Sequence, residues 1–132
     1  MQSKPTVHDT VKRQAIKDAW ARKILNKKNA LIERKQFLIQ RAGRCAEILK
    51  DEFLVTEVYL IGSLARPGPI HEQTDIDLVE AGLADNLYFK ALNRLYEIAK
   101  DDQGKEVNID LIALEDATDR MKEIVSSMGV KL

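Results

Sequence analysis

The sequence predicts an α/β (α+β) fold, in which a small mixed β-sheet carries packed helices and follows an N-terminal helical extension. Three observations predict it. Residues 7–50 contain no proline and one glycine, and their apolar residues recur at helical spacing. Short runs rich in β-forming residues follow at 58–61, 75–79 and 107–113. Two more segments have helical spacing, 85–100 and 116–128, the second ending at Gly129.

The N-terminal segment is expected to be helical and basic. Its apolar stripe consists of Trp20, Ile24, Leu31, Leu38, Ala42, Cys45 and Leu49. The polar residues 26–29 interrupt this stripe, so we expect two helices with Asn29 capping the second. One long helix with a polar waist is the alternative.

Charge divides the chain into two parts. Residues 1–50 carry thirteen Lys and Arg against four Asp and Glu, a balance of +9, and residues 51–132 carry eight against seventeen, a balance of −9. We therefore expect residues 1–50 to form a basic helical segment that packs on or extends from a domain at 51–132. The basic segment is either a solvated helix face or a docking surface for an acidic protein or nucleic acid.

Composition excludes several classes of protein. No run of about 18 apolar residues is present, so a transmembrane helix is not expected. Residues 1–10 lack the apolar stretch of a secretory signal. Cys45 is the single cysteine, which excludes an internal disulfide and a Cys-based zinc site. We expect a cytoplasmic protein without membrane contact.

Three aspartates are the candidate catalytic and metal-binding residues. Asp75 and Asp77 are two residues apart on a predicted strand, so their carboxylates point to the same face. Asp110 lies within an apolar strand, where a lone carboxylate is costly unless it is paired or coordinated. If the two strands are neighbours, the carboxylates converge and can hold two Mg²⁺ ions roughly 3.5–4 Å apart. The other interpretation is that these polar residues mark exposed strand edges.

A glycine-containing turn supplies the candidate nucleotide-binding residues. Gly62 ends the first apolar strand and allows backbone amides to approach phosphate oxygens closely. The hydroxyl of Ser63 can donate to a phosphate, and Arg66 adds positive charge.

Together these residues resemble the DNA polymerase β-like nucleotidyltransferase superfamily. The matching motifs are Leu60-Ile61-Gly62-Ser63, then Asp75-Ile76-Asp77-Leu78, then Ile109-Asp110-Leu111. Within the superfamily the chain is most similar to the minimal nucleotidyltransferase (MNT) antitoxins, over residues 42–132. The resemblance implies a catalytic domain at 51–132 that transfers AMP from ATP to a hydroxyl of a HEPN ribonuclease toxin, with Mg²⁺.

Two departures from the family pattern keep other functions open. Leu64 stands where the family commonly has arginine, and Pro67 stands where it has glycine. One alternative is a silent member of the fold that acts by binding its partner. Another is a nucleotidyltransferase acting on RNA or a small molecule, with the basic segment as the acceptor site. Association into a homo-oligomer is compatible with each of these functions.

Overall fold

A single long helix opens the fold in the computed structural model, which describes residues 6–132. Helix α1 spans Val7–Phe53, 47 residues, and begins with a capping box between Thr6 and Asp9. The expected break at residues 26–29 is wrong, because these residues continue the helix as a polar waist. Asparagine and lysine cost little inside a helix, and neither glycine nor proline is present there to stop it.

Four strands form one mixed sheet, which confirms the predicted fold class. They are β1 (Glu57–Ile61), β2 (Ile76–Ala81), β3 (Ile109–Ala113) and β4 (Val130–Lys131), in the order β3-β2-β1-β4. Strand β1 pairs antiparallel with β2 and β4, and β2 pairs parallel with β3. Strand β4 was not predicted, because two residues are too few to show a strand pattern.

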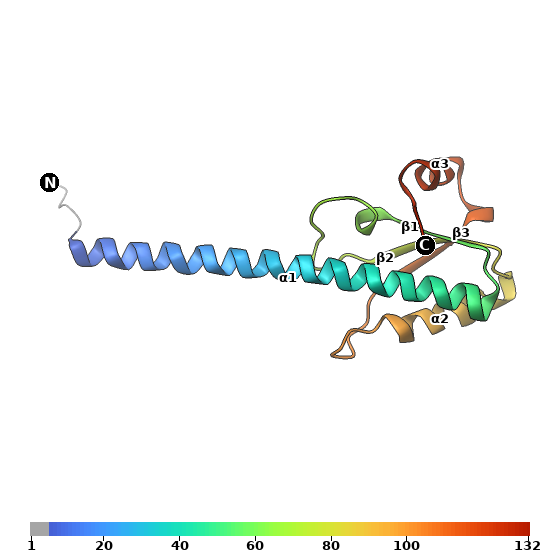
Figure 1. Cartoon of the computed structure of the whole chain (residues 1–132), viewed down its shortest axis with the longest axis horizontal. Helices are drawn as coiled ribbons and strands as arrows, with labels where there is room; N and C mark the ends of the chain where they lie inside the picture. The colour runs from blue at the N-terminus through green and yellow to red at the C-terminus, as the bar shows by residue number, and fades with distance from the viewer. Residues whose placement is uncertain (1–5) are drawn as a thin grey trace.

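The remaining helices are α2 (Tyr88–Ala99) and α3 (Asp119–Met128). Both begin three residues later than expected, because short 3₁₀ turns at 85–87 and 114–116 precede them. Helices α1 and α2 share one face of the sheet, and α3 covers the other, as Figure 1 shows.

The larger core lies between the sheet, α1 and α2. Helix α1 contributes Leu38, Ala42, Cys45 and Leu49, each fully buried. Burial raises the pKa of the Cys45 thiol to about 12, so this cysteine stays protonated and unreactive. Helix α2 is fixed to β3 by Tyr88, whose hydroxyl donates to the Leu111 carbonyl at 2.7 Å. None of the helices in residues 6–132 is long and apolar enough to cross a membrane.

The first half of α1 projects away from the rest of the molecule, as Figure 1 shows. We call residues 7–30 the arm. Its apolar residues are largely exposed, including Trp20 at 60% and Ile24 at 63%. Full burial along α1 begins only at Leu38. The side chains of α1 thus change from exposed to buried within the helix. The predicted division into a basic segment at 1–50 and a domain at 51–132 stays a prediction.

Candidate active site

Asp77 and Asp110 face each other across two neighbouring strands. Strands β2 and β3 are parallel and pair in a register that sets Asp77 beside Asp110. Asp77 is half-buried, and Asp110 is exposed at the edge of the sheet. Burial, followed by a hydrogen bond and charge repulsion from Asp110, raises the pKa of Asp77 to about 6. The structure thus brings together two of the three predicted carboxylates.

Gly62 lies directly against Asp77. The β1–β2 register places Ile61 opposite Asp77, so the turn after β1 begins beside the Asp77 carboxylate. Gly62 has φ +77°, and a Cβ atom added there would lie 2.5 Å from Asp77 Oδ2. Only glycine therefore satisfies both the backbone conformation and the space. Ser63 follows within the 3₁₀ turn Gly62–Leu64 and is partly exposed.

Asp75 precedes β2 by one residue and is partly exposed. Its charge contributes to the raised pKa of Asp77, which places it close to the pair. Asp75 also lines a polar cavity of about 450 Å³ at the N-terminal ends of β2 and β3, with Arg34, Lys105 and Asn108 on other walls. Sequence patterns gave no signal for these three, which the fold brings from separate segments.

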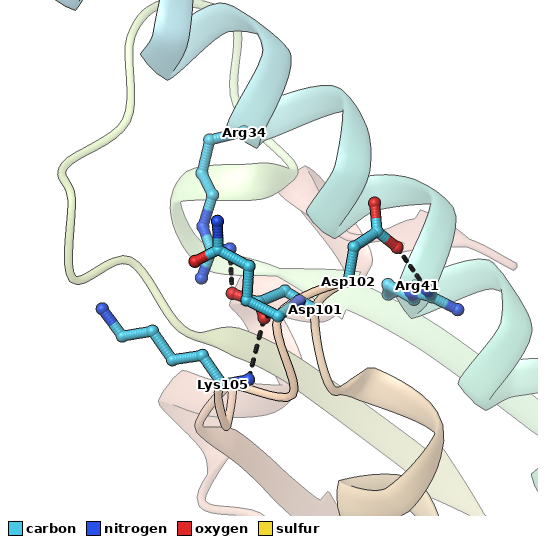
Figure 2. A network of polar contacts seen from close by, with 6 residues as sticks. Arg34, Arg41, Asp101, Asp102 and Lys105 are labelled. Carbon is cyan, nitrogen blue, oxygen red and sulfur yellow. Dashed lines mark hydrogen bonds and ion pairs between the residues drawn. The ribbon is translucent and has the colours of Figure 1, made fainter.

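The wall of this cavity is held by ion pairs between α1 and the turn that follows α2, drawn in Figure 2. Arg34 Nη1 lies 3.7 Å from Asp101 Oδ2, and Arg41 Nη2 lies 4.0 Å from Asp102 Oδ1. Asp101 Oδ1 also accepts a hydrogen bond from the backbone nitrogen of Lys105 at 2.8 Å. The basic residues of the second half of α1 therefore position the turn that leads towards β3.

Arg66, the third predicted nucleotide-binding residue, is exposed on the loop after the 3₁₀ turn. It borders a small cavity of about 210 Å³ between the Gly62 turn and α3, whose walls include Met121, Ile124 and Met128. The α3 residues were not predicted, because their helical spacing indicated only a packed face. This cavity places apolar side chains beside the predicted phosphate-binding turn.

The carboxylates fit a divalent cation of the magnesium type. Burial first, and then the hydrogen bond and negative charge of Asp110, raise the pKa of Asp77. A cation between the two carboxylates would relieve their repulsion. Within residues 6–132 no group of three or more His, Cys, Asp or Glu side chains lies close enough to enclose an ion. Magnesium suits such an incomplete site, since it is usually held by one or two carboxylates, substrate phosphates and water.

The mixed sheet, the Gly-Ser turn after β1 and the carboxylates on β2 and β3 have the arrangement that the sequence predicts for a nucleotidyltransferase. The sequence matches the family described as "Nucleotidyltransferase domain" over residues 43–131. Because this match covers more than half of the chain, the protein belongs to that family. No curated protein matches the sequence significantly.

Solved structures of toxin–antitoxin complexes are similar to this chain. A mutant complex containing MntA is 18% identical, with a TM-score of 0.55 over 68% of this chain and 70% of the other. A toxin–antitoxin structure with AMP-PNP is 20% identical, with a TM-score of 0.54 over 68% and 70%. The structure of the tri-AMPylated HEPN toxin of Shewanella oneidensis with its MNT antitoxin is 18% identical, with a TM-score of 0.50 over 71% of this chain and 70% of the other. At these identities the similarity shows the fold.

Proposed function

We propose that this protein is a metal-dependent nucleotidyltransferase that transfers AMP from ATP to a hydroxyl of a partner protein. We further propose that the partner is a HEPN-type toxin and that this chain is its antitoxin, acting in the cytoplasm. The observation that carries the proposal is the contact of Gly62 with Asp77, the carboxylate that pairs with Asp110. A phosphate-binding turn and a metal-binding carboxylate pair serve phosphoryl chemistry only when they are adjacent.

Each site residue has a role in this proposal. The backbone amides at Gly62 and Ser63, with the Ser63 hydroxyl, hold oxygens of the triphosphate. Arg66 adds a positive charge from the exposed loop. Asp75 and Asp77 would hold both Mg²⁺ ions, and Asp110 would hold the one on the acceptor side. Bound Mg²⁺ supplies charge stabilisation to the phosphate oxygens and lowers the pKa of the acceptor hydroxyl.

The reaction is a substitution at the α-phosphorus of ATP. The acceptor oxygen forms a bond to this phosphorus, and the bond to the oxygen bridging to the β-phosphate breaks, releasing pyrophosphate. Asp110, the most exposed of the three carboxylates, is placed to take the hydroxyl proton directly or through water. We assign Asp77, which is half-buried, to the nucleotide side.

The similar structures support the choice of partner and nucleotide. One contains a HEPN toxin described as tri-AMPylated together with an MNT antitoxin, and another contains AMP-PNP. In both, the similarity covers 70% of the matched chain. These proteins have the same fold as this chain, and we carry their partner class and nucleotide over as part of the proposal.

Transfer of label tests the proposal. The chain is co-expressed with a HEPN-type protein from the same genome, and incorporation of α-labelled ATP into that protein is measured with and without Mg²⁺. We expect Mg²⁺-dependent labelling that Asp77→Asn abolishes. Asp51→Asn, at an exposed position near the end of α1, is the matched control and should label normally. Binding of the HEPN-type protein without any labelling by the unaltered chain would contradict the proposed activity and favour a binding-only role.

A further inference from the structure

The arm and the turns of α1 that follow it present apolar side chains that the described part of the chain does not bury. Leu25 is 55% exposed, Ile32 50% and Ile39 38%, and they are spaced seven residues apart along α1. Trp20 and Ile24, which continue the face that is buried further down the helix, are 60% and 63% exposed. Most helical stability in proteins comes from packing of an apolar face, and the described residues leave this face of the arm exposed.

These residues lead into a groove on the body of the protein. The groove has a volume of about 520 Å³ and lies between α1 and the loop at residues 68–70. Its apolar walls are Leu31, Ile32, Ile39, Pro69 and Ile70. Arm and groove thus form one apolar surface, which runs from Trp20 to the body and which we call the arm surface.

The arm surface is basic. Residues 7–30 carry seven Lys and Arg and two Asp. Lys28 and Lys35 line the groove itself, in the same stretch of helix as Ile32. Lys35 Nζ donates to the backbone carbonyls of Arg66 and Gly68, both at 2.7 Å, so Lys28 is the lysine in the groove that is free of these backbone contacts. A matching surface must therefore be apolar at its centre and carry carboxylates beside that centre.

The helices within residues 6–132 do not provide such a surface. A second arm is equally basic and would be repelled. Helix α2 carries Lys90, Arg94 and Glu97, and α3 carries two acidic and two basic residues, so neither has an acid surplus. Nucleic acid matches the charge but leaves the aliphatic residues uncovered, since single strands stack on aromatic side chains and Trp20 is the arm's one aromatic residue.

We infer that the arm surface docks an amphipathic helix of a partner protein, whose apolar stripe is flanked by Asp and Glu. The apolar stripe of the partner helix covers Ile24, Leu25 and Ile32, and its carboxylates pair with Lys28 and neighbouring arm lysines. In this mode of recognition the partner helix lies along the groove, and its apolar side chains one and two turns apart contact the groove. The inference concerns binding only and does not depend on the proposed transfer activity.

Trp20 makes the inference measurable, because it is the only tryptophan in the chain and lies within the arm surface. The probe is a synthetic 28-residue helical peptide with Leu at the heptad a and d positions and Glu at the e and g positions. Repulsion between the Glu side chains keeps two copies of the peptide from pairing with each other. Titration into the full-length protein should shift Trp20 emission to shorter wavelength and saturate. Added salt should weaken the binding. No shift, or equal binding of a peptide with Lys at e and g, overturns the inference.

Two matched pairs of variants locate the contact. Ile24→Asp should abolish the shift, whereas Ala19→Asp, an exposed site on the opposite side of the arm, should not. Lys28→Glu should weaken binding about tenfold and Lys12→Glu, also on the far side, should have little effect. Equal effects within either pair overturn the inference. All four variants should bind Mg²⁺–ATP as the unaltered chain does, which separates a failure here from a failure of the proposed function.

Two further outcomes would identify a different occupant of the arm surface. A shift in Trp20 emission that depends on protein concentration alone, with dimers in sedimentation, would identify a second copy as the occupant. Tighter binding of a 30-nucleotide poly(U) strand than of the acidic peptide would identify nucleic acid. Either result overturns the inference.

Discussion

The carboxylate end of the sheet and the arm of α1 obtain their chemistry in different ways. Gly62, Asp77 and Asp110 come from three separate segments, and only the pairing of β1, β2 and β3 brings Gly62 against Asp77 and Asp77 beside Asp110. The arm residues follow one another along a single helix and remain exposed. A function at the first region therefore depends on the whole fold, whereas a function at the second should survive changes that do not break the helix.

The largest expected effect is on transfer by Asp110→Ala. Asp110 is exposed beside the half-buried Asp77, and we propose that it faces the acceptor. The variant should retain most of its affinity for Mg²⁺–ATP while the rate of transfer falls by several orders of magnitude, as expected for an interaction made in the transition state. Single-turnover transfer and nucleotide affinity are measured on the same preparation. A parallel loss of affinity would place Asp110 in the nucleotide site instead.

A second prediction compares burial at the two ends of α1. Leu38→Ala removes a fully buried side chain and should lower the free energy of unfolding by about 2–5 kcal/mol. Ile24→Ala, in the arm, changes a side chain that is 63% exposed and should stay within about 0.5 kcal/mol. Urea unfolding followed by circular dichroism measures both. Similar losses would mean that the arm is part of the cooperative core.

A third prediction uses two glycines. Gly62→Ala places a Cβ at φ +77° and 2.5 Å from Asp77 Oδ2, so we expect a loss of about 1–2 kcal/mol in unfolding free energy and a displaced carboxylate. Nucleotide affinity should fall with it. Gly43→Ala is the matched control, since a Cβ there meets nothing within 4 Å and alanine favours the helix. It should leave stability unchanged or slightly raised. Normal nucleotide affinity in Gly62→Ala would remove this turn from the site.

The smallest expected effect is a dependence of stability on pH. The pKa of Asp77 is about 6 in the fold and ordinarily 3.8, so the unfolded chain releases this proton more easily. Without metal, the contribution of Asp77 to stability is full below about pH 4 and is lost as pH rises through about 6. Asp77→Asn should remove this decline, and its melting temperature above pH 6 should equal or exceed that of the unaltered chain. An unchanged pH profile in the variant would show that Asp77 is not perturbed.

Much of the fold could be predicted from the sequence because its signals are local. The strand at 57–61 and the helix ending at Met128 follow from residue type and spacing. The continuity of α1 could not be predicted, since the residues at 26–29 are compatible with a turn and with a helix. Periodicity predicted the apolar face of α1, but it does not say which part of that face the fold covers.

The candidate site divides in the same way. Alternation along the chain was enough to place Asp77 and Asp110 on strands, and Gly62 at a strand end. Their contact depends on the parallel register of β2 with β3, which is a property of the folded sheet. Arg34 and Lys105 approach Asp75 only through the packing of α1 against the turn after α2, which no local pattern records. The roles of these residues stay predictions until the variants are measured.

The hydrogen bonds from Lys35 to the carbonyls of Arg66 and Gly68 have a thermodynamic consequence. One lysine lies in the wall of the groove and also holds the loop that carries Arg66. If occupation of the groove changes the affinity for nucleotide by some factor, nucleotide must change the affinity of the groove for its occupant by the same factor. The two ligands of this protein would then report on each other, and measuring either affinity with the other ligand present would give their coupling free energy.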